Sequence, residues 1–228
     1  IWMGDYIEMK NRIIEKIESG YRCIKLKIGA INFEDEIKLL KQIRADFTSE
    51  DLELRLDANG AFKPKEAREK LQILSDYDIH SIEQPIKARQ WLAMAEICDN
   101  PSIPIALDEE LIGIDDHMEL SKMLDELNPQ YIILKPSLIG GLSKSNSFIR
   151  EADNRNIGWW VTSALEGNIG LNAIAQWTYT LNNSLPHGLG TGQLFKNNID
   201  SPLIIENANL KYDNKRNWNF NLITNDLS

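Results

Sequence analysis

The sequence predicts an α/β fold of the (β/α)8 type, a TIM barrel, and three observations point to it. Short apolar runs alternate with amphipathic segments of helical period along most of the chain. The 228 residues are enough for one such barrel. A charged residue also stands near the carboxyl end of each predicted strand between residues 23 and 135, where barrel enzymes place their active sites.

The first predicted unit is a helix over 8–19 followed by a strand over 23–29. The apolar residues of the helix recur at helical spacing, and a glycine follows them as a stop signal. In the strand, the apolar side chains face one way, whereas Lys25 and Lys27 share the opposite face. Because an unpaired buried ammonium group is costly, this pair indicates a polar interior with countercharges.

The same unit recurs as far as residue 192. We expect helices over 33–47, 64–76, 89–98, 115–126, 143–155 and 168–181. We expect strands over 52–59, 80–85, 103–110, 131–137 and 158–164, a Gly-rich strand end over 186–192, and the tail of an eighth strand at Ile1–Met3. Strands joined through helices form right-handed parallel units. An open doubly wound sheet has the same rhythm, but no Gly-rich dinucleotide fingerprint opens a helix here.

Domain organisation follows from where this rhythm stops. No linker or low-complexity tract interrupts the series, so residues 1–200 are assigned to one barrel domain. Residues 201–228 contain Asn-rich turns and short apolar runs instead, which predicts a returning extension rather than another unit.

Composition narrows the partners and the compartment. With 34 acidic and 25 basic residues, the net charge of −9 does not favour nucleic acid or an anionic membrane. No apolar run approaches the roughly 20 residues that cross a bilayer. The two cysteines, Cys23 and Cys98, make no disulfide framework, and no secretory signal is visible. We therefore expect a cytoplasmic protein with a small-molecule substrate; the first residue, Ile1, suggests a fragment.

Five charged residues mark the strand ends at intervals of 25 to 30 residues: Lys27, Asp57, Glu83, Asp108 and Lys135. In a closed parallel barrel, these ends meet at one rim. Three carboxylates on successive strands repel one another unless a cation neutralises them. Hard oxygen ligands favour Mg²⁺, with Mn²⁺ as the alternative. A lysine on each side of such a triad suits removal of a proton next to a carboxylate.

Three neighbours of these residues are candidates for supporting roles. A lysine acts as a base only when its pKa falls well below about 10.4, and nearby positive charge lowers it. Lys25, on the same face as Lys27, can supply that charge. Arg55 lies on the face of Asp57 as a candidate charge partner, and Asn59 either orients a ligand or forms a turn.

One loop is a candidate for binding an anion. The segment TSALEGNIG (162–170) runs from a strand end into a helix N-terminus, where free backbone N–H groups favour negative charge. Ser163 and the amides around Gly167 are candidates for binding a substrate carboxylate. A plain N-capping turn explains the same residues equally well.

Five motifs, in this order, resemble the enolase superfamily in its muconate-lactonizing-enzyme-like branch: KLK (25–27), DAN (57–59), EQP (83–85), DEE (108–110) and KPS (135–137). The resemblance covers nearly the whole chain. It implies the modified barrel of that superfamily and a small carboxylate substrate. It also implies that two lysines are the acid/base residues and three carboxylates bind Mg²⁺: Lys27 and Lys135, and Asp57, Glu83 and Asp108.

The resemblance also bears on the boundaries and the reaction. Members carry an N-terminal capping domain, which we expect to be missing from this chain and to be the packing partner of residues 201–228. Segments 162–177 and 187–199 are similar to dehydratases of the branch, so a carbon–oxygen lyase is the first expectation. An N-acylamino acid racemase or dipeptide epimerase of the same superfamily, and a non-catalytic barrel fragment, are the alternatives.

Overall fold

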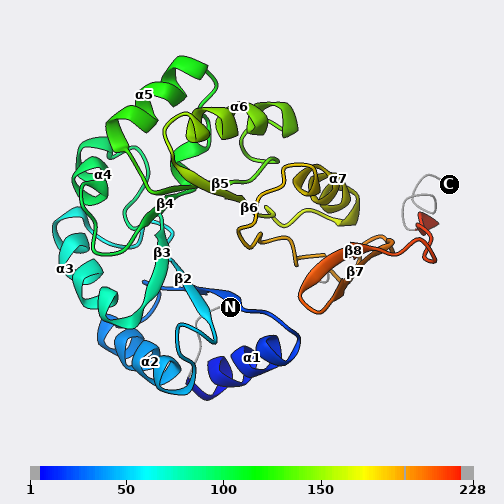
Figure 1. Ribbon diagram of the computed structural model, residues 1–228, viewed down its shortest axis with the longest axis horizontal. Helices are drawn as coiled ribbons and strands as arrows, with labels where there is room; N and C mark the ends of the chain where they lie inside the picture. The colour runs from blue at the N-terminus through cyan, green and yellow to red at the C-terminus, as the bar shows by residue number, and fades with distance from the viewer. Residues whose placement is uncertain (1–5, 193, 222–228) are drawn as a thin grey trace.

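The curled parallel sheet is the main feature of the molecule. A computed structural model describes residues 6–192 and 194–221. Six strands, β1 to β6, pair in sequential order and run parallel. The helices lie on the outer side of the curl, so that the sheet forms an incomplete barrel (Figure 1).

Strands and helices alternate in the predicted order, with boundaries that shift by a few residues. The strands are β1 (Cys23–Lys27), β2 (Glu53–Asp57), β3 (Ile79–Glu83), β4 (Ile105–Leu107), β5 (Tyr131–Leu134) and β6 (Gly158–Val161). The helices are α1 (Tyr6–Glu18), α2 (Phe33–Asp46), α3 (Pro64–Leu74), α4 (Trp91–Cys98), α5 (His117–Leu127), α6 (Leu142–Asp153) and α7 (Asn168–Tyr179). Two 3₁₀ turns are η1 (Ser75–Tyr77) and η2 (Glu109–Leu111).

The register of the sheet places the charged strand ends side by side. Lys27 lies opposite Asp57, and Asp57 lies opposite Glu83, across the parallel pairs β1–β2 and β2–β3. Because side chains alternate along a strand, residues two apart share a face. The apolar face of each strand packs under the helices, where Leu26, Leu54 and other aliphatic residues are buried.

The interior of the curl has its own small packing cluster. Ala106, Ile133 and Trp160 form a group separate from the core that lies under the helices. The Arg55 guanidinium stands 4.1 Å from the centre of the Trp160 ring, and the Tyr131 ring packs against the same tryptophan. This cluster fills the barrel interior beneath the strand ends and supports the charged residues there.

The sequence predicts a closed barrel of eight strands. In the described residues the parallel sheet has six strands and does not close. Segment 186–192 contributes one parallel bridge, from Gly188 to Thr162, in place of the expected strand. Pro186 has no N–H to donate and the three glycines of this segment weaken a strand, which accounts for the difference. The predicted strand at Ile1–Met3 lies outside the described residues.

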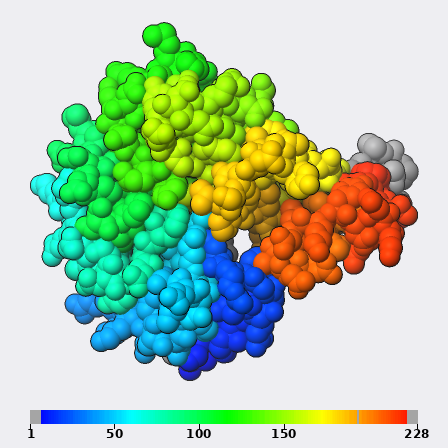
Figure 2. Space-filling model, in the orientation of Figure 1, coloured from blue at the N-terminus to red at the C-terminus, as the bar shows by residue number. Residues whose placement is uncertain are grey.

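The C-terminal segment forms a separate antiparallel hairpin, β7 (Leu203–Glu206) and β8 (Asn209–Tyr212). A Cβ on Gly20 would lie 3.1 Å from the Asn207 carbonyl carbon, so the hairpin touches the turn after α1. Figure 2 shows this segment, in orange and red, projecting beside the N-terminal segment in blue. The hairpin therefore contacts the barrel, and its packing against a capping domain stays a prediction.

Two further sequence features can be placed. Cys23 and Cys98 are both free, and burial raises the pKa of each thiol to about 12. Both thiols are therefore protonated and unreactive at neutral pH. In the described ranges, no helix has the length and apolar character that spanning a bilayer requires.

The interior cluster predicts a large effect of Trp160→Ala. This side chain is among the largest fully buried ones, so its loss leaves a cavity under the strand ends. We expect the free energy of unfolding to fall by about 3–5 kcal/mol in urea titrations. Trp218→Ala, in the C-terminal segment, is the matched control, with an expected loss of about 1 kcal/mol or less. Equal losses would contradict the packing role.

Candidate active site

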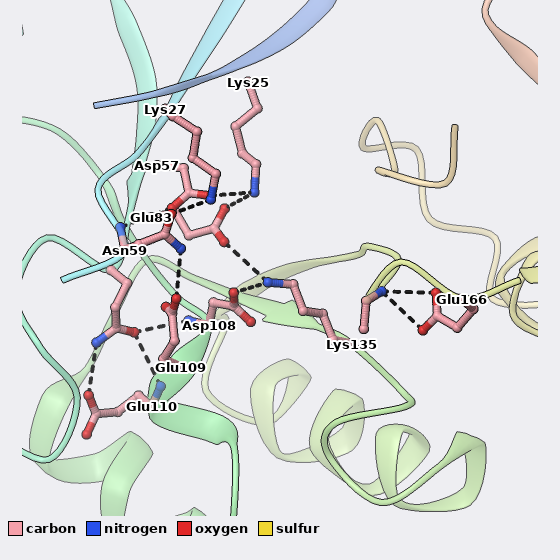
Figure 3. A network of polar contacts seen from close by, with 12 residues as sticks. Lys25, Lys27, Asp57, Asn59, Glu83, Asp108, Glu109, Glu110, Lys135 and Glu166 are labelled. Carbon is pink, nitrogen blue, oxygen red and sulfur yellow. Dashed lines mark hydrogen bonds and ion pairs between the residues drawn. The ribbon is translucent and has the colours of Figure 1, made fainter. Parts of the chain in front are cut away.

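The structure brings the five charged residues at the strand ends together inside the curl (Figure 3). Asp57, Glu83 and Asp108 have side chains that are each 1% exposed. Lys27 and Lys135 approach them from the two sides, with side chains that are 29% and 17% exposed. The carboxylates are thus shielded from water, whereas the lysines line the accessible surface of the site.

Each carboxylate has an ammonium partner. Lys25 Nζ lies 2.5 Å from Glu83 Oε2 and 3.0 Å from Asp57 Oδ2. Lys27 Nζ lies 2.6 Å from the same Asp57 oxygen. Lys135 forms an ion pair with Asp108 and lies 3.8 Å from Glu83 Oε1. Three lysines therefore neutralise three carboxylates, which offsets the desolvation of both sets of charges.

The pKa shifts follow from burial and from these pairs. Burial, together with the charges of Asp57 and Asp108, raises the pKa of Glu83 to about 8 despite the nearby Lys25. Burial disfavours the Asp57 carboxylate as well, but Lys25 and Lys27 outweigh it and hold the Asp57 pKa below its ordinary value. The site therefore disfavours the charged form of Glu83 and favours that of Asp57.

Two of the lysines are held in their charged form. Burial alone would lower the pKa of Lys25, but Glu83 and Asp57 outweigh it, so that this pKa is raised. Burial likewise opposes the charge on Lys135, and Asp108 and Glu83 reverse the effect and raise its pKa. Both ammonium groups are therefore cationic at neutral pH.

The oxygen atoms of this site suit a hard divalent cation. Glu83 Oε1 is buried and has no hydrogen-bond partner in the described part of the chain. Carboxylate oxygens are the donors that Mg²⁺ and Mn²⁺ prefer. Within residues 6–192 and 194–221, no three acidic, His or Cys side chains are arranged closely enough to enclose a metal ion. In this structure the three carboxylates form ion pairs with lysines.

Asn59 forms a turn, which is one of the two roles that the sequence left open, and its side chain contacts Lys27. Its backbone has a φ of 44°, and its N–H donates to Asp57 Oδ1 at 3.1 Å, which makes a turn. A Cβ on the next residue, Gly60, would lie 2.8 Å from the Lys87 Cα, so only glycine fits. The side-chain amide of Asn59 also accepts a hydrogen bond from Lys27 and thereby orients it.

Arg55 differs from the prediction. Its Nε donates to Glu53 Oε1 at 2.8 Å, and its Nη1 donates to the Pro186 carbonyl at 3.1 Å. The guanidinium therefore points down to the Trp160 cluster rather than up to Asp57. Two residues along a strand separate Arg55 from the strand end, and its long side chain extends this separation. Its charge partner is Glu53.

The loop that enters α7 is occupied by the chain's own side chains. Ser163 Oγ donates to Glu166 Oε2 at 2.6 Å, and Ser137 Oγ donates to Glu166 Oε1 at 2.5 Å. The Ala164 N–H donates to both oxygens of Glu166. Gly167 is the N-cap residue of α7 and makes no side-chain cap. Around Ser163, the hydrogen bonds proposed for a substrate carboxylate are thus already made to Glu166.

Glu166 is a polar residue of this loop that none of the sequence motifs includes. Burial opposes its charge, but hydrogen bonds from Ser137, Ser163 and the Ala164 N–H hold its pKa below the ordinary value. The spacing Ser163-x-x-Glu166 is that of a capping box, and this signal could have identified the pair. The nearby α7 amide of Asn168 donates to Asn198 Oδ1 at 2.9 Å.

Fold and site together define a class of protein. Two lysines face each other across three buried carboxylates at the carboxyl ends of a curled parallel sheet. Lysine side chains can act as acids or bases, and the carboxyl ends of the strands are where barrel enzymes place their active sites. Residues 8–215 match the enolase C-terminal domain-like family, and the chain belongs to that family.

Individual relatives agree with this assignment. The chain is 52% identical over 206 residues to the o-succinylbenzoate synthase of Desulfotalea psychrophila, covering 90% of this chain and 56% of that protein. The crystal structure of MenC from Desulfotalea psychrophila matches with a TM-score of 0.88 and 50% identity, over 92% of this chain and 58% of that one. The hydrophobic dipeptide epimerase of Enterococcus faecalis is 35% identical over 50% of this chain and 32% of that protein.

The lengths of these proteins differ. The chain spans between about a third and three fifths of each relative that it matches. The shared part includes the strands that carry the lysines and the carboxylates.

The Glu166 network predicts a pH-dependent effect of Glu166→Gln. Because the folded-state pKa of Glu166 is lowered, its charge stabilises the fold above the unfolded pKa of about 4.3, and this contribution is lost as pH falls through the folded-state value. We expect the variant to be less stable by about 1 kcal/mol at pH 7, since the group is partly exposed. Urea titrations at pH 7 and pH 3 measure the difference. A loss that is the same at both pH values would contradict this role.

Proposed function

We propose that the protein acts as an o-succinylbenzoate synthase. In this reaction 2-succinyl-6-hydroxy-2,4-cyclohexadiene-1-carboxylate loses water to give 2-succinylbenzoate, a step of menaquinone biosynthesis. The observation that carries the proposal is the pair of opposed lysines in a chain that is 52% identical, over 206 residues, to such a synthase. The segments 162–177 and 187–199, which resemble these dehydratases in sequence, support it.

We propose Mg²⁺ as the cofactor, with Mn²⁺ as the alternative. Asp57, Glu83 and Asp108 would hold the ion, in exchange for some of their present contacts with lysines. When bound, the ion supplies a positive charge that stabilises negative charge developing on the substrate carboxylate. The buried Glu83 Oε1 supports this assignment: it accepts no hydrogen bond in the described residues and its ion pair with Lys135 is long, at 3.8 Å, and a desolvated carboxylate oxygen favours a cation.

Lys27 is the proposed base. It removes the proton from the ring carbon that carries the carboxylate, and the same ammonium group then returns a proton to the leaving hydroxyl. The C–H and C–O bonds break, a ring double bond forms, and water leaves. Aromatisation of the ring drives the step. Asn59, which contacts Lys27, limits the directions that the ammonium group can take.

Lys135 is the proposed electrostatic partner on the opposite side. Its raised pKa keeps it cationic, so that it stabilises the negative charge that appears as the proton leaves. The pair with Asp108 fixes its position. Lys25, also cationic, balances the triad from the side of Lys27.

A dipeptide epimerase is the second candidate. The 35% identity to the Enterococcus faecalis epimerase favours it. The geometry suits that reaction as well, because lysines on two faces of a substrate can remove a proton from one side and return it from the other. An N-acylamino acid racemase needs the same arrangement.

We further propose residues 1–200 as the barrel domain and 201–228 as an extension that packs against a capping domain. The separate hairpin of β7 and β8 supports this division. A cytoplasmic location without nucleic acid or membrane partners accords with the excess of acidic residues and the free cysteines.

Lysine substitutions in the intact protein test the proposal. Because general acid–base catalysis contributes about 100- to 10,000-fold, Lys27→Ala and Lys135→Ala should each reduce kcat for dehydration by a factor in that range. Spectrophotometry of 2-succinylbenzoate formation measures it, and Lys38→Ala, an exposed lysine on α2, is the control. Epimerisation of dipeptides far faster than dehydration would favour the second candidate. Neither activity in the wild-type protein would favour a non-catalytic role.

A further inference from the structure

The three consecutive acids at the end of β4 point in three directions. Asp108 pairs with Lys135. Glu110 is fully buried and accepts hydrogen bonds from the Arg89 N–H at 2.7 Å and from Trp91 Nε1 at 2.8 Å. Glu109 lies between them in the turn η2 and takes part in neither set of contacts. Its function is not explained by the metal triad or by packing.

Glu109 contacts the amide that faces Lys27. Glu109 Oε1 accepts a hydrogen bond from Asn59 Nδ2 at 2.8 Å, and Asn59 Oδ1 accepts one from Lys27 (Figure 3). The other oxygen of Glu109 is buried, and in the described residues it has no hydrogen-bond partner. The side chain of Asn59 therefore joins Glu109 to the proposed base.

The direction of these bonds matters because an amide side chain has two unlike ends. A carboxylate only accepts hydrogen bonds, so Glu109 requires the NH₂ group of Asn59 to point toward it. The carbonyl oxygen must then point toward Lys27, where it accepts from the ammonium group. If the amide were reversed, its NH₂ group would face a cation, which also only donates.

The scaffold holds both ends of this chain of contacts. Asn59 sits in a turn with positive φ, closed by its own N–H to Asp57 Oδ1. On the other side, the buried carboxylate of Glu110 anchors the η2 turn that carries Glu109. The amide therefore has a fixed backbone on one side and a fixed acceptor on the other, and its orientation is determined.

We propose that Glu109 is a positioning residue, which fixes the orientation of the Asn59 amide and through it directs Lys27 toward the substrate. This inference rests on the proposed function for Lys27. Glu109 contacts Asn59 directly, and its proposed effect on Lys27 passes through that amide. Loss of Glu109 should therefore reduce turnover while leaving substrate binding largely intact.

A double-mutant cycle with the intact protein and saturating Mg²⁺ tests this. Misplacement of a catalytic group costs up to about 100-fold, so Glu109→Ala should lower kcat about 10- to 100-fold with KM changed less than about threefold. Glu109→Gln retains an acceptor and should recover most of the rate. Asn59→Gly keeps the positive φ, and adding Glu109→Ala to it should cost nothing further. Additive losses, or a KM effect alone, would overturn the proposal.

A second measurement needs no turnover. The side-chain NH₂ resonance of Asn59 in ¹H–¹⁵N NMR spectra should shift and exchange faster in Glu109→Ala, but not in Glu206→Gln, an exposed acid of the hairpin. An unchanged resonance would overturn the inference. If the wild-type protein epimerises dipeptides instead of dehydrating, the same cycle is measured on that reaction, and only the proposed function fails. If the wild-type protein catalyses neither reaction, the NMR comparison still tests whether Glu109 orients the Asn59 amide, and an unchanged resonance overturns that part of the inference.

Discussion

The structure of the site depends on one constraint: three buried carboxylates need positive charge close to them. Asp57, Glu83 and Asp108 lie on adjacent strands with almost no access to water, where like charges repel strongly. Lys25, Lys27 and Lys135 meet that need in the present arrangement. Burial and the charges of Asp57 and Asp108 nevertheless raise the pKa of Glu83, which disfavours its charged form. A divalent cation held by the triad would add positive charge there, and the lysines would then be available to a substrate.

The fold meets this requirement through strand register and packing. Parallel pairing places the strand ends at one rim, and side-chain alternation sends charged residues inward while aliphatic residues pack under helices. Below the rim, Trp160 and its neighbours fill the interior, so that the charged layer rests on a packed, apolar one. Arg55 belongs to this lower layer, where Glu53 and the Trp160 ring balance its charge.

Much of this could be predicted from sequence, for a physical reason. The strand–helix rhythm and the position of Lys27 or Asp57 within a strand depend on local periodicity, which a sequence shows directly. The roles of Arg55 and Glu166 depend on how far a side chain reaches and on which neighbours it meets, which periodicity does not determine. The Gly-rich strand end expected over 186–192 is reduced to one parallel bridge, because Pro186 and the glycines have poor strand propensity.

The three acids after β4 also show which features of a site cannot be predicted from sequence. The motif DEE is visible in the sequence, but the three directions of its side chains depend on the η2 turn and on partners from other strands. Asn59 was left between a turn and a ligand-orienting role because both use the same residue type. The structure shows the backbone of Asn59 in the turn and its side-chain amide against Lys27, whereas a role in orienting a ligand stays a prediction.

The exchange of lysine contacts for a cation can be observed directly. Anomalous diffraction from crystals of the intact protein grown with Mn²⁺ locates the ion without reference to activity. The account predicts one strong peak at about 2.0–2.3 Å from oxygens of Asp57, Glu83 and Asp108, with at least one lysine moved off its carboxylate. Absence of a peak there, with all three lysines still paired to the carboxylates, would contradict it.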